Sequence, residues 1–105
     1  GRWATVLLLD GNIGIGGDPT ALLRRVSRLV RRDGAVIVEL EPAWSRAGAQ
    51  VVRLEIDGEP GPWFRWTRVR VDQLAPLARA AGFVPTVTWS ESGRWFARLR
   101  REAAA

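Results

Sequence analysis

The chain has 105 residues and a formal net charge of +5, which fits one domain with a modest core. It contains no His, Lys, Tyr, Cys or Met. These absences exclude a histidine-based triad, a zinc site of His or Cys ligands, and a Schiff-base lysine within this chain. We therefore expect no metal site. Any chemistry must use carboxylates, hydroxyls, Asn, Arg, Trp or backbone groups.

Every basic residue of the chain is an arginine. Arginine binds phosphate and carboxylate groups well, so nucleic acid or another anionic partner has to be considered. A coding bias that favours Arg codons over Lys codons explains the same observation, and it makes nucleic acid the less favoured partner.

No run of about 20 apolar residues and no signal-peptide pattern is present, so we expect no membrane contact and a cytoplasmic location. The first residue is Gly1, and we expect the chain to be a piece of a longer one.

A glycine-rich stretch connects the first predicted strand to the first predicted helix. Trp3–Leu9 is apolar and predicts a buried strand. Asp18 is a suitable N-cap for a helix that has Pro19 at its first position. Ligands of open α/β sheets bind beyond the carboxyl ends of the strands, where this stretch would lie. Its glycines either serve a ligand there or simply allow the chain to turn: Gly11, Gly14, Gly16 and Gly17.

Helical spacing then predicts a helix over Pro19–Arg32, with Gly34 as its left-handed terminator. Its apolar face is Leu22, Leu23, Val26, Leu29 and Val30, and its arginines, Arg24, Arg25, Arg28, Arg31 and Arg32, are expected to face water. Ala35–Leu40 is a second apolar run, typical of a strand parallel to the first in a right-handed βαβ unit. Glu39 and Glu41 end this strand at the same edge as Asp10. These acids either bind a cationic group or end the strand in water.

The second half of the chain predicts shorter elements. Pro42–Ala49 is expected to be a loop. From Gln50 to Asp57 apolar and charged residues alternate, as in a half-exposed antiparallel strand, and Trp63–Val69 is predicted to pair back after the turn at Asp57-Gly58.

A second helix is predicted over Asp72–Ala81, provided that Pro76 lies in or near its first turn, and Gly82 ends it. The chain then forms a hairpin of Phe83–Trp89, a turn at Ser90–Gly93, and Arg94–Arg100. Pro85 indicates an edge or bulge position in this hairpin. We expect the alanine-rich tail to fray.

Together, these segments resemble the carboxyl-terminal half of a class I S-adenosylmethionine-dependent methyltransferase. The resemblance rests on the ordered set LLLDGNIGIGGDP, LLRRVSRLVRRDGAVIVELEP, PWFRW, LARAAGF and GRWFARL, and it covers essentially the whole chain. It implies an α/β fold: a partial Rossmann-like domain over 1–105, with a mixed sheet made of a parallel βαβ core and a C-terminal antiparallel hairpin. The family's GxGxG cofactor loop is missing, since GNIGIGG does not align with it.

The resemblance also implies where a site would lie. The first strand would be the family's fourth, and the loop after it would line the methyl-transfer edge near the methionine end of S-adenosylmethionine. The implied cofactor-binding residues are Asp10, Gly11, Asn12, Ile13 and Gly14. Methyl transfer can be driven mainly by proximity and alignment, so the missing His and Lys do not oppose it. The Asn12 amide either orients a substrate or caps a turn.

Aromatic and arginine side chains are the substrate-side candidates. Trp63, Trp66 and Arg94 could hold a flat or anionic small molecule. Each tryptophan, and Trp95 above all, could instead belong to the core.

A half-fold has consequences for assembly. In the family the fourth strand lies beside the first, and the last strand runs antiparallel between the fifth and sixth. Without its neighbour, the strand at 3–9 is a bare apolar edge, so we expect self-association there. We also expect the chain alone to be inactive and to bind S-adenosylmethionine weakly or not at all. Two other functions stay open: an Arg/Trp-rich nucleic-acid or anion-binding module, and a non-catalytic α/β interaction domain.

Overall fold

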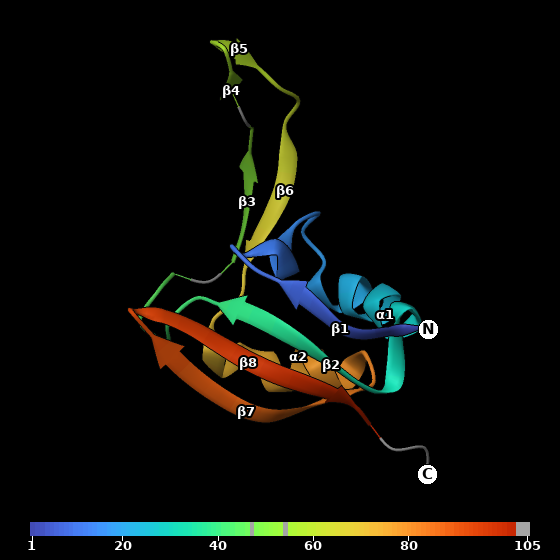
Figure 1. Ribbon diagram of the computed structural model, residues 1–105. Helices are drawn as coiled ribbons and strands as arrows, with labels where there is room; N and C mark the ends of the chain where they lie inside the picture. The colour runs from blue at the N-terminus through green and yellow to red at the C-terminus, as the bar shows by residue number, and fades with distance from the viewer. Residues whose placement is uncertain (47, 54, 103–105) are drawn as a thin grey trace.

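The computed structural model describes residues 1–46, 48–53 and 55–102, and its centre is a four-stranded mixed sheet (Figure 1). The strands are β1 (Trp3–Leu8), β2 (Val30–Leu40), β7 (Phe83–Glu91) and β8 (Arg94–Arg101), in the order β1-β2-β8-β7. β1 and β2 are parallel, whereas β8 runs antiparallel between β2 and β7. The predicted fold class is confirmed, and the strand order is the one implied by the resemblance.

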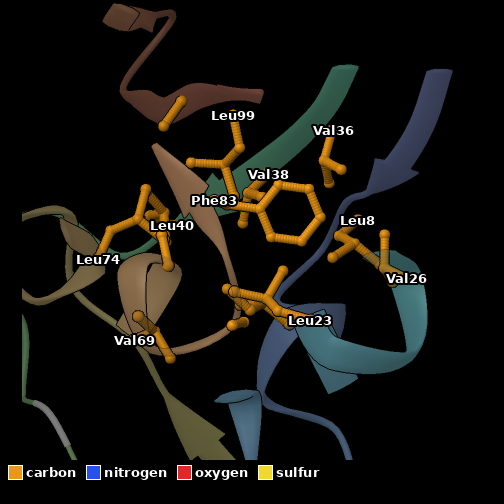
Figure 2. Packing of buried hydrophobic residues seen from close by; sticks show 14 of the residues in the cluster. Leu8, Leu23, Val26, Val36, Val38, Leu40, Val69, Leu74, Phe83 and Leu99 are labelled. Carbon is orange, nitrogen blue, oxygen red and sulfur yellow. The ribbon is translucent and has the colours of Figure 1, made fainter. Parts of the chain in front are cut away.

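Both helices cover the same face of this sheet. α1 (Pro19–Leu29) and α2 (Leu74–Ala80) contribute buried residues to one cluster with alternate residues of the strands. The cluster includes Leu23, Val26, Val36, Val38, Leu74, Phe83 and Leu99, most of which Figure 2 shows packed together. Alternate strand residues point to opposite faces, and in the described part of the chain no helix covers the other face of the sheet.

The start of α1 is as predicted. Asp18 Oδ1 accepts a hydrogen bond of 3.0 Å from the Ala21 N–H, and Pro19 occupies the first turn. Arg24, Arg25 and Arg28 are exposed on the outer side of the helix, as expected.

The predicted end of α1 is wrong. The helix stops at Leu29, and Val30 already has extended backbone angles at the start of β2. Arg31 and Arg32 therefore lie exposed in a strand. Gly34 is no helix terminator: a Cβ there would lie 2.6 Å from Val30 Cγ2 and 2.7 Å from the Ala4 carbonyl oxygen. Glycine is needed because two chain segments approach each other, which helical spacing cannot reveal.

The expectation of a buried first strand is also only partly met. Leu8 is buried, but Trp3 is 60% exposed and Leu7 is 59% exposed. These two side chains lie on the uncovered face of the sheet at its edge, where no described element packs over them.

An arm of paired strands extends from the sheet between β2 and α2 (Figure 1). β3 (Gly48–Val52) pairs antiparallel with β6 (Phe64–Arg68), and β4 (Glu55–Ile56) pairs with β5 (Glu59–Pro60) at the tip. The arm makes the molecule elongated, with extents of 49 × 29 × 22 Å.

The predicted pairing of these segments is confirmed, but β3 begins at Gly48, inside the expected loop. Ala47 of that loop, Leu54 of the expected strand, and the tail at 103–105 lie outside the described residues.

The C-terminal elements follow the sequence closely. A short 3-10 turn, η2 (Val71–Gln73), precedes α2, so Pro76 lies in the first turn of the helix. Pro85 lies at a register shift in the edge strand β7, as predicted. The hairpin turn is shorter than expected, because Ser92 and Gly93 alone connect the strands, both with positive φ. No helix of the described residues is long and apolar enough to cross a membrane.

Two leucines of α1 test this account of the core. Leu23 is fully buried, whereas Leu29 is 49% exposed, although sequence spacing puts both on one stripe. We expect Leu23→Ala to lower the free energy of unfolding by about 2–5 kcal/mol through the lost contacts and the cavity. Leu29→Ala is the matched control and should change it by no more than about 0.5 kcal/mol. Urea unfolding measures both, and equal losses would contradict the packing described here.

Candidate functional site

A hollow of about 550 Å³ lies at the carboxyl ends of β1 and β2. The arm and the β7–β8 turn form its other walls. Its lining residues come from four segments: Asp10 and Gly11; Glu39, Leu40, Glu41 and Pro42; Val52, Phe64, Trp66 and Arg68; and Gly93 and Arg94. In an open α/β sheet this is the edge at which ligands bind, so we take the hollow as the candidate site.

A tight turn after β1 forms one wall of the hollow. The Asn12 N–H donates to the Leu9 carbonyl at 3.0 Å, and between them Asp10 and Gly11 both have left-handed backbone angles, with φ of 55° and 75°. Gly adopts this conformation freely, and Asp tolerates it better than most residues. The turn therefore exposes the Asp10 side chain at the rim.

The glycine-rich loop packs against the arm. A Cβ on Gly11 would lie 3.2 Å from Trp66 Cζ2, one on Gly17 would lie 2.9 Å from Arg65 Cβ, and one on Gly14 would collide with the Thr67 carbonyl. The Gly16 N–H donates to the Arg65 carbonyl at 2.9 Å, and Thr67 Oγ1 donates to the Gly17 carbonyl at 2.9 Å. These glycines thus let the glycine-rich loop approach β6 closely. Their three-residue spacing was the sequence signal that could have predicted this contact.

The structure separates the five predicted cofactor-side residues. Asp10 and Gly11 line the hollow, and Asn12 is exposed beside them. Ile13 is only 1% exposed and belongs to the core cluster, and Gly14 is buried against β6. Both residues belong to the short 3-10 turn η1 (Asn12–Gly14), which turns them inward, and the Ile13 side chain fills the space between α1 and the sheet. Neither Ile13 nor Gly14 lines the site.

Arg94 joins the two strand ends through their acids. Its Nε donates to Glu39 Oε2 at 2.9 Å, and its Nη2 donates to Glu39 Oε1 at 2.6 Å and to Asp10 Oδ1 at 3.3 Å. The Asp10 N–H donates to Glu39 Oε1 at 2.9 Å. The Glu39 side chain is 14% exposed, whereas those of Arg94 and Asp10 are 51% and 85% exposed. This network fixes the β7–β8 turn over the ends of β1 and β2.

The contact between Arg94 and Glu39 shifts the pKa of both groups. Hydrogen bonding from the Arg94 guanidinium holds the pKa of the Glu39 carboxyl below its ordinary value of 4.5; burial opposes this shift, and the Asp10 N–H adds to it. The hydrogen bond to Glu39 raises the pKa of Arg94 in turn. Glu39 is therefore ionised at neutral pH, and its counter-charge is Arg94.

These contacts answer two questions that the sequence left open. Among the described residues, the cation that meets the acids at this edge is Arg94 itself. The Arg94 side chain lines the hollow and is 51% exposed, but its Nε and Nη2 are bonded to Glu39. Glu41 lies apart from this network, and its Oε2 accepts a hydrogen bond of 3.3 Å from Ser45 Oγ. No group of three or more potential metal ligands occurs within the described ranges.

The tryptophans divide in a similar way. Trp66 is half-buried and lines the hollow with Phe64, at 6.0 Å between ring centroids. Trp63 is 61% exposed outside the hollow, where the Arg53 guanidinium lies 4.6 Å from its ring. Trp95 is half-buried in β8, opposite Leu40.

Sequence reasoning missed Phe64 and Arg68 as lining residues. The signal was present, because Phe64, Trp66 and Arg68 alternate along one strand and so share a face.

No family model and no curated protein matches this chain. Solved structures do match. A S-adenosylmethionine-dependent methyltransferase from Bacteroides fragilis, crystallised with S-adenosyl-L-homocysteine, aligns with a TM-score of 0.73 at 19% identity, over 96% of this chain and 48% of that one. The methyltransferase CcbJ from Streptomyces caelestis aligns with a TM-score of 0.70 at 12% identity, over 97% and 58%. This chain has part of a methyltransferase-like fold.

A third match is the 1,6-didemethyltoxoflavin-N1-methyltransferase of Burkholderia thailandensis, solved with 1,6-didemethyltoxoflavin and S-adenosylhomocysteine. Its TM-score is 0.65 at 18% identity, over 97% of this chain and 45% of that one. The chain with the methyltransferase fold therefore spans about half the length of the solved structures that it matches.

Replacing Arg94 tests the charge network. In Arg94→Gln we expect the pKa of Glu39 to rise toward 4.5, followed by NMR of the side-chain carboxyl. A lowered pKa in the folded state stabilises the protein above the unfolded value, and this stability is lost as the pH falls through the folded pKa. The free energy of unfolding should thus be higher for the unsubstituted chain than for Arg94→Gln at neutral pH. The two values should converge in acid.

Arg98→Gln is the matched control, because Arg98 lies on the same strand and its Nη1 is 3.4 Å from Thr86 Oγ1. Arg98→Gln removes one positive charge, as Arg94→Gln does, but at a position that is not bonded to Glu39. If both variants move the Glu39 titration equally, the long-range charge of the protein and not the hydrogen-bonded fork is responsible.

Proposed function

We propose that this chain is the C-terminal portion of a S-adenosylmethionine-dependent methyltransferase that acts on a small molecule. The observation that carries the proposal is the hollow at the carboxyl ends of β1 and β2, on a sheet with the methyltransferase strand order. Neighbours with this fold bind S-adenosylhomocysteine, and one of them binds a small heterocyclic substrate, 1,6-didemethyltoxoflavin. The share of their length that this chain spans supports a partial fold.

The residues at the rim fit the methionine end of the cofactor. S-adenosylmethionine carries a positive sulfonium, which supplies a methyl group for in-line transfer to a nucleophile. The Asp10 carboxylate is 85% exposed although its Oδ1 accepts a hydrogen bond of 3.3 Å from Arg94, and the Trp66 ring lies against Gly11, so an anion and an aromatic face meet at one place. Both groups attract cations. We assign Asp10 and Gly11, with Asn12 beside them, to the cofactor side.

The opposite wall suits the substrate. Trp66 and Phe64 offer apolar faces for a flat molecule, and Glu41 and Arg68 offer charges of both signs on the same hollow. Since Arg94 is held by Glu39, we assign it to positioning the β7–β8 turn rather than to direct substrate contact. The Glu41 carboxylate is placed to accept a hydrogen bond, or a proton, from a substrate amine or hydroxyl.

The proposal explains why the isolated chain should bind the cofactor poorly. The glycine loop that holds adenosine in this family has no counterpart in the sequence. Alignment of the methyl donor contributes much of the rate, so a half-site should not support turnover.

Titration with S-adenosylhomocysteine, followed by amide and indole NMR signals, tests the site. We expect weak, millimolar-range binding that shifts the signals of Asp10, Gly11 and the Trp66 indole. Trp66→Ala should remove these shifts, whereas Trp3→Ala should retain them, because Trp3 is exposed at the start of β1, at the opposite end of this strand from the hollow. Shifts confined to other surfaces would overturn the assignment, and tight binding by calorimetry would contradict the half-site.

The edge strand β1 gives a separate prediction. We propose that the isolated chain self-associates through β1, whose outer edge has no partner strand within the described residues. Sedimentation velocity at low micromolar concentration should show species larger than a monomer. Leu7→Lys places a charge on the exposed side of this strand and should remove this association, whereas a clean monomer for the unsubstituted chain would count against it.

A further inference from the structure

The amino ends of β1 and β2 meet the end of α1 on the side of the sheet opposite the hollow (Figure 1). A Cβ on Gly1 would collide with the Leu29 carbonyl group, so the first residues of the chain lie against the last turn of α1. This contact brings two exposed arginines, Arg2 and Arg28, to one place.

The start of β2 adds two more arginines at this end. Trp3 pairs in register with Val30, so the residues that follow Val30 lie beside the start of β1. They include Arg31 and Arg32, both exposed. Helical spacing put these two on α1, whereas the fold carries them onto a strand next to Trp3.

The ends of α2 and β8 complete the cluster. Arg24 Nη2 donates to the Ala80 carbonyl at 3.5 Å and so lies at the end of α2. β8 finishes there too, because the Glu102 N–H donates to the Gly82 carbonyl at 2.8 Å. These two elements contribute three further arginines: Arg79, Arg100 and Arg101. We call this surface of eight arginines the basic end.

The basic end accounts for the net charge of the protein. It holds eight of the 16 arginines but only two of the 11 acids, Asp33 and Glu102. The other eight arginines and nine acids nearly cancel, so the net charge of +5 arises at this end. Within the ranges that the structure describes, one ion pair forms here: Arg31 Nε lies 3.5 Å from Asp33 Oδ1, with side chains 51% and 83% exposed. A pair so exposed contributes little to stability, so the fold does not explain the cluster.

The composition of the basic end indicates its partner. Protein interfaces have apolar centres with few charged residues, whereas nucleic-acid interfaces are more polar and far more positive. Arginine forks match the geometry of phosphate groups. Trp3 is 60% exposed beside Arg2 and Arg31, and it offers a ring on which an unpaired base can stack. Arginines around an exposed aromatic ring fit a single strand.

We propose that the basic end binds single-stranded nucleic acid, with backbone phosphates on the arginines and a base stacked on Trp3. Stacking and phosphate contacts read no base edges, so the binding is independent of sequence. The inference does not rest on the proposed methyltransferase function, because the basic end and the hollow lie at opposite ends of β1 and β2.

Fluorescence anisotropy with a labelled oligothymidine of about 20 nucleotides tests the arginines. We expect a dissociation constant of about 1–100 µM near 0.15 M NaCl, and an affinity that falls steeply with salt. Arg28→Gln with Arg31→Gln and Arg32→Gln should weaken binding at least about tenfold. It should also lower the slope of log affinity against log salt by about two, since each phosphate contact of a single strand releases about 0.7 counterions.

The matched control removes three arginines that lie outside the basic end: Arg46→Gln with Arg53→Gln and Arg98→Gln. This variant has the same net charge as the first and should keep the salt slope of the unsubstituted chain. Equal losses of affinity in the two triple variants would overturn the proposal, because the overall charge of the protein would then be responsible.

Trp3 tests the single strand. Trp3→Ala should weaken binding of oligothymidine about fivefold or more, and Trp3→Phe should restore most of it. Trp63→Ala removes an equally exposed ring from the arm and should have no effect. Trp3→Ala should leave the affinity for a DNA duplex unchanged, since paired bases are not free to stack. No loss with oligothymidine, or an equal loss with the duplex, would overturn the stacking.

NMR of the unsubstituted chain keeps the test independent of how any variant folds. Oligothymidine should shift the amide signals of Arg28, Arg31 and Arg32 and the indole signal of Trp3, and leave those of Asp10 and Gly11 in place. Shifts confined to the hollow would contradict the proposal. Displacement of the oligonucleotide by polyglutamate at equal charge would also overturn it, because the partner would then be an acidic polypeptide.

Discussion

The parallel pairing of β1 with β2 places the functional elements of this chain. The register sets Leu8 beside Val38, so both strands end at the same edge, and Asp10, just after β1, meets Glu39, near the end of β2. Two acids at one edge would repel each other, and the β7–β8 turn supplies the compensating charge through Arg94. Burial of the apolar faces drives the sheet together, and the pairing of β8 with β2 up to Leu40 and Trp95 brings Arg94 to the strand ends.

A second constraint is the contact between the glycine-rich loop and the arm. Three glycines spaced by three residues remove the side chains that would keep β6 away, and the backbone bonds from Gly16 and Thr67 then tie the two segments together. Trp66 is carried over Gly11 by the same contact. The wall of the hollow is therefore built by residues that lie about 50 positions apart in sequence, and no ligand is required to explain the glycines.

Several exposed apolar side chains lie on the edges of the sheet and on the arm. Trp3 and Leu7 lie on β1, Val87 lies on β7, and Val51 and Ile56 lie on the arm. Isolated exposed apolar residues are ordinary, but these follow an unpaired edge, a sheet face without a helix and a two-stranded arm.

The sequence by itself determined the order and type of the elements, because periodicity, caps and turn residues are local signals. Asp18-Pro19, Pro76 and Pro85 each act within a few residues, and their predicted roles hold. It also determined that Asp10 and Glu39 share an edge, since parallel strands leave little choice. Tertiary structure alone decided that Arg94 occupies those acids, that Gly34 and Gly14 accommodate neighbouring backbone, that Ile13 is buried, and that Trp66 but not Trp63 faces the hollow. Those outcomes depend on contacts between segments that are distant in the sequence, and a local sequence pattern does not predict which segments will meet.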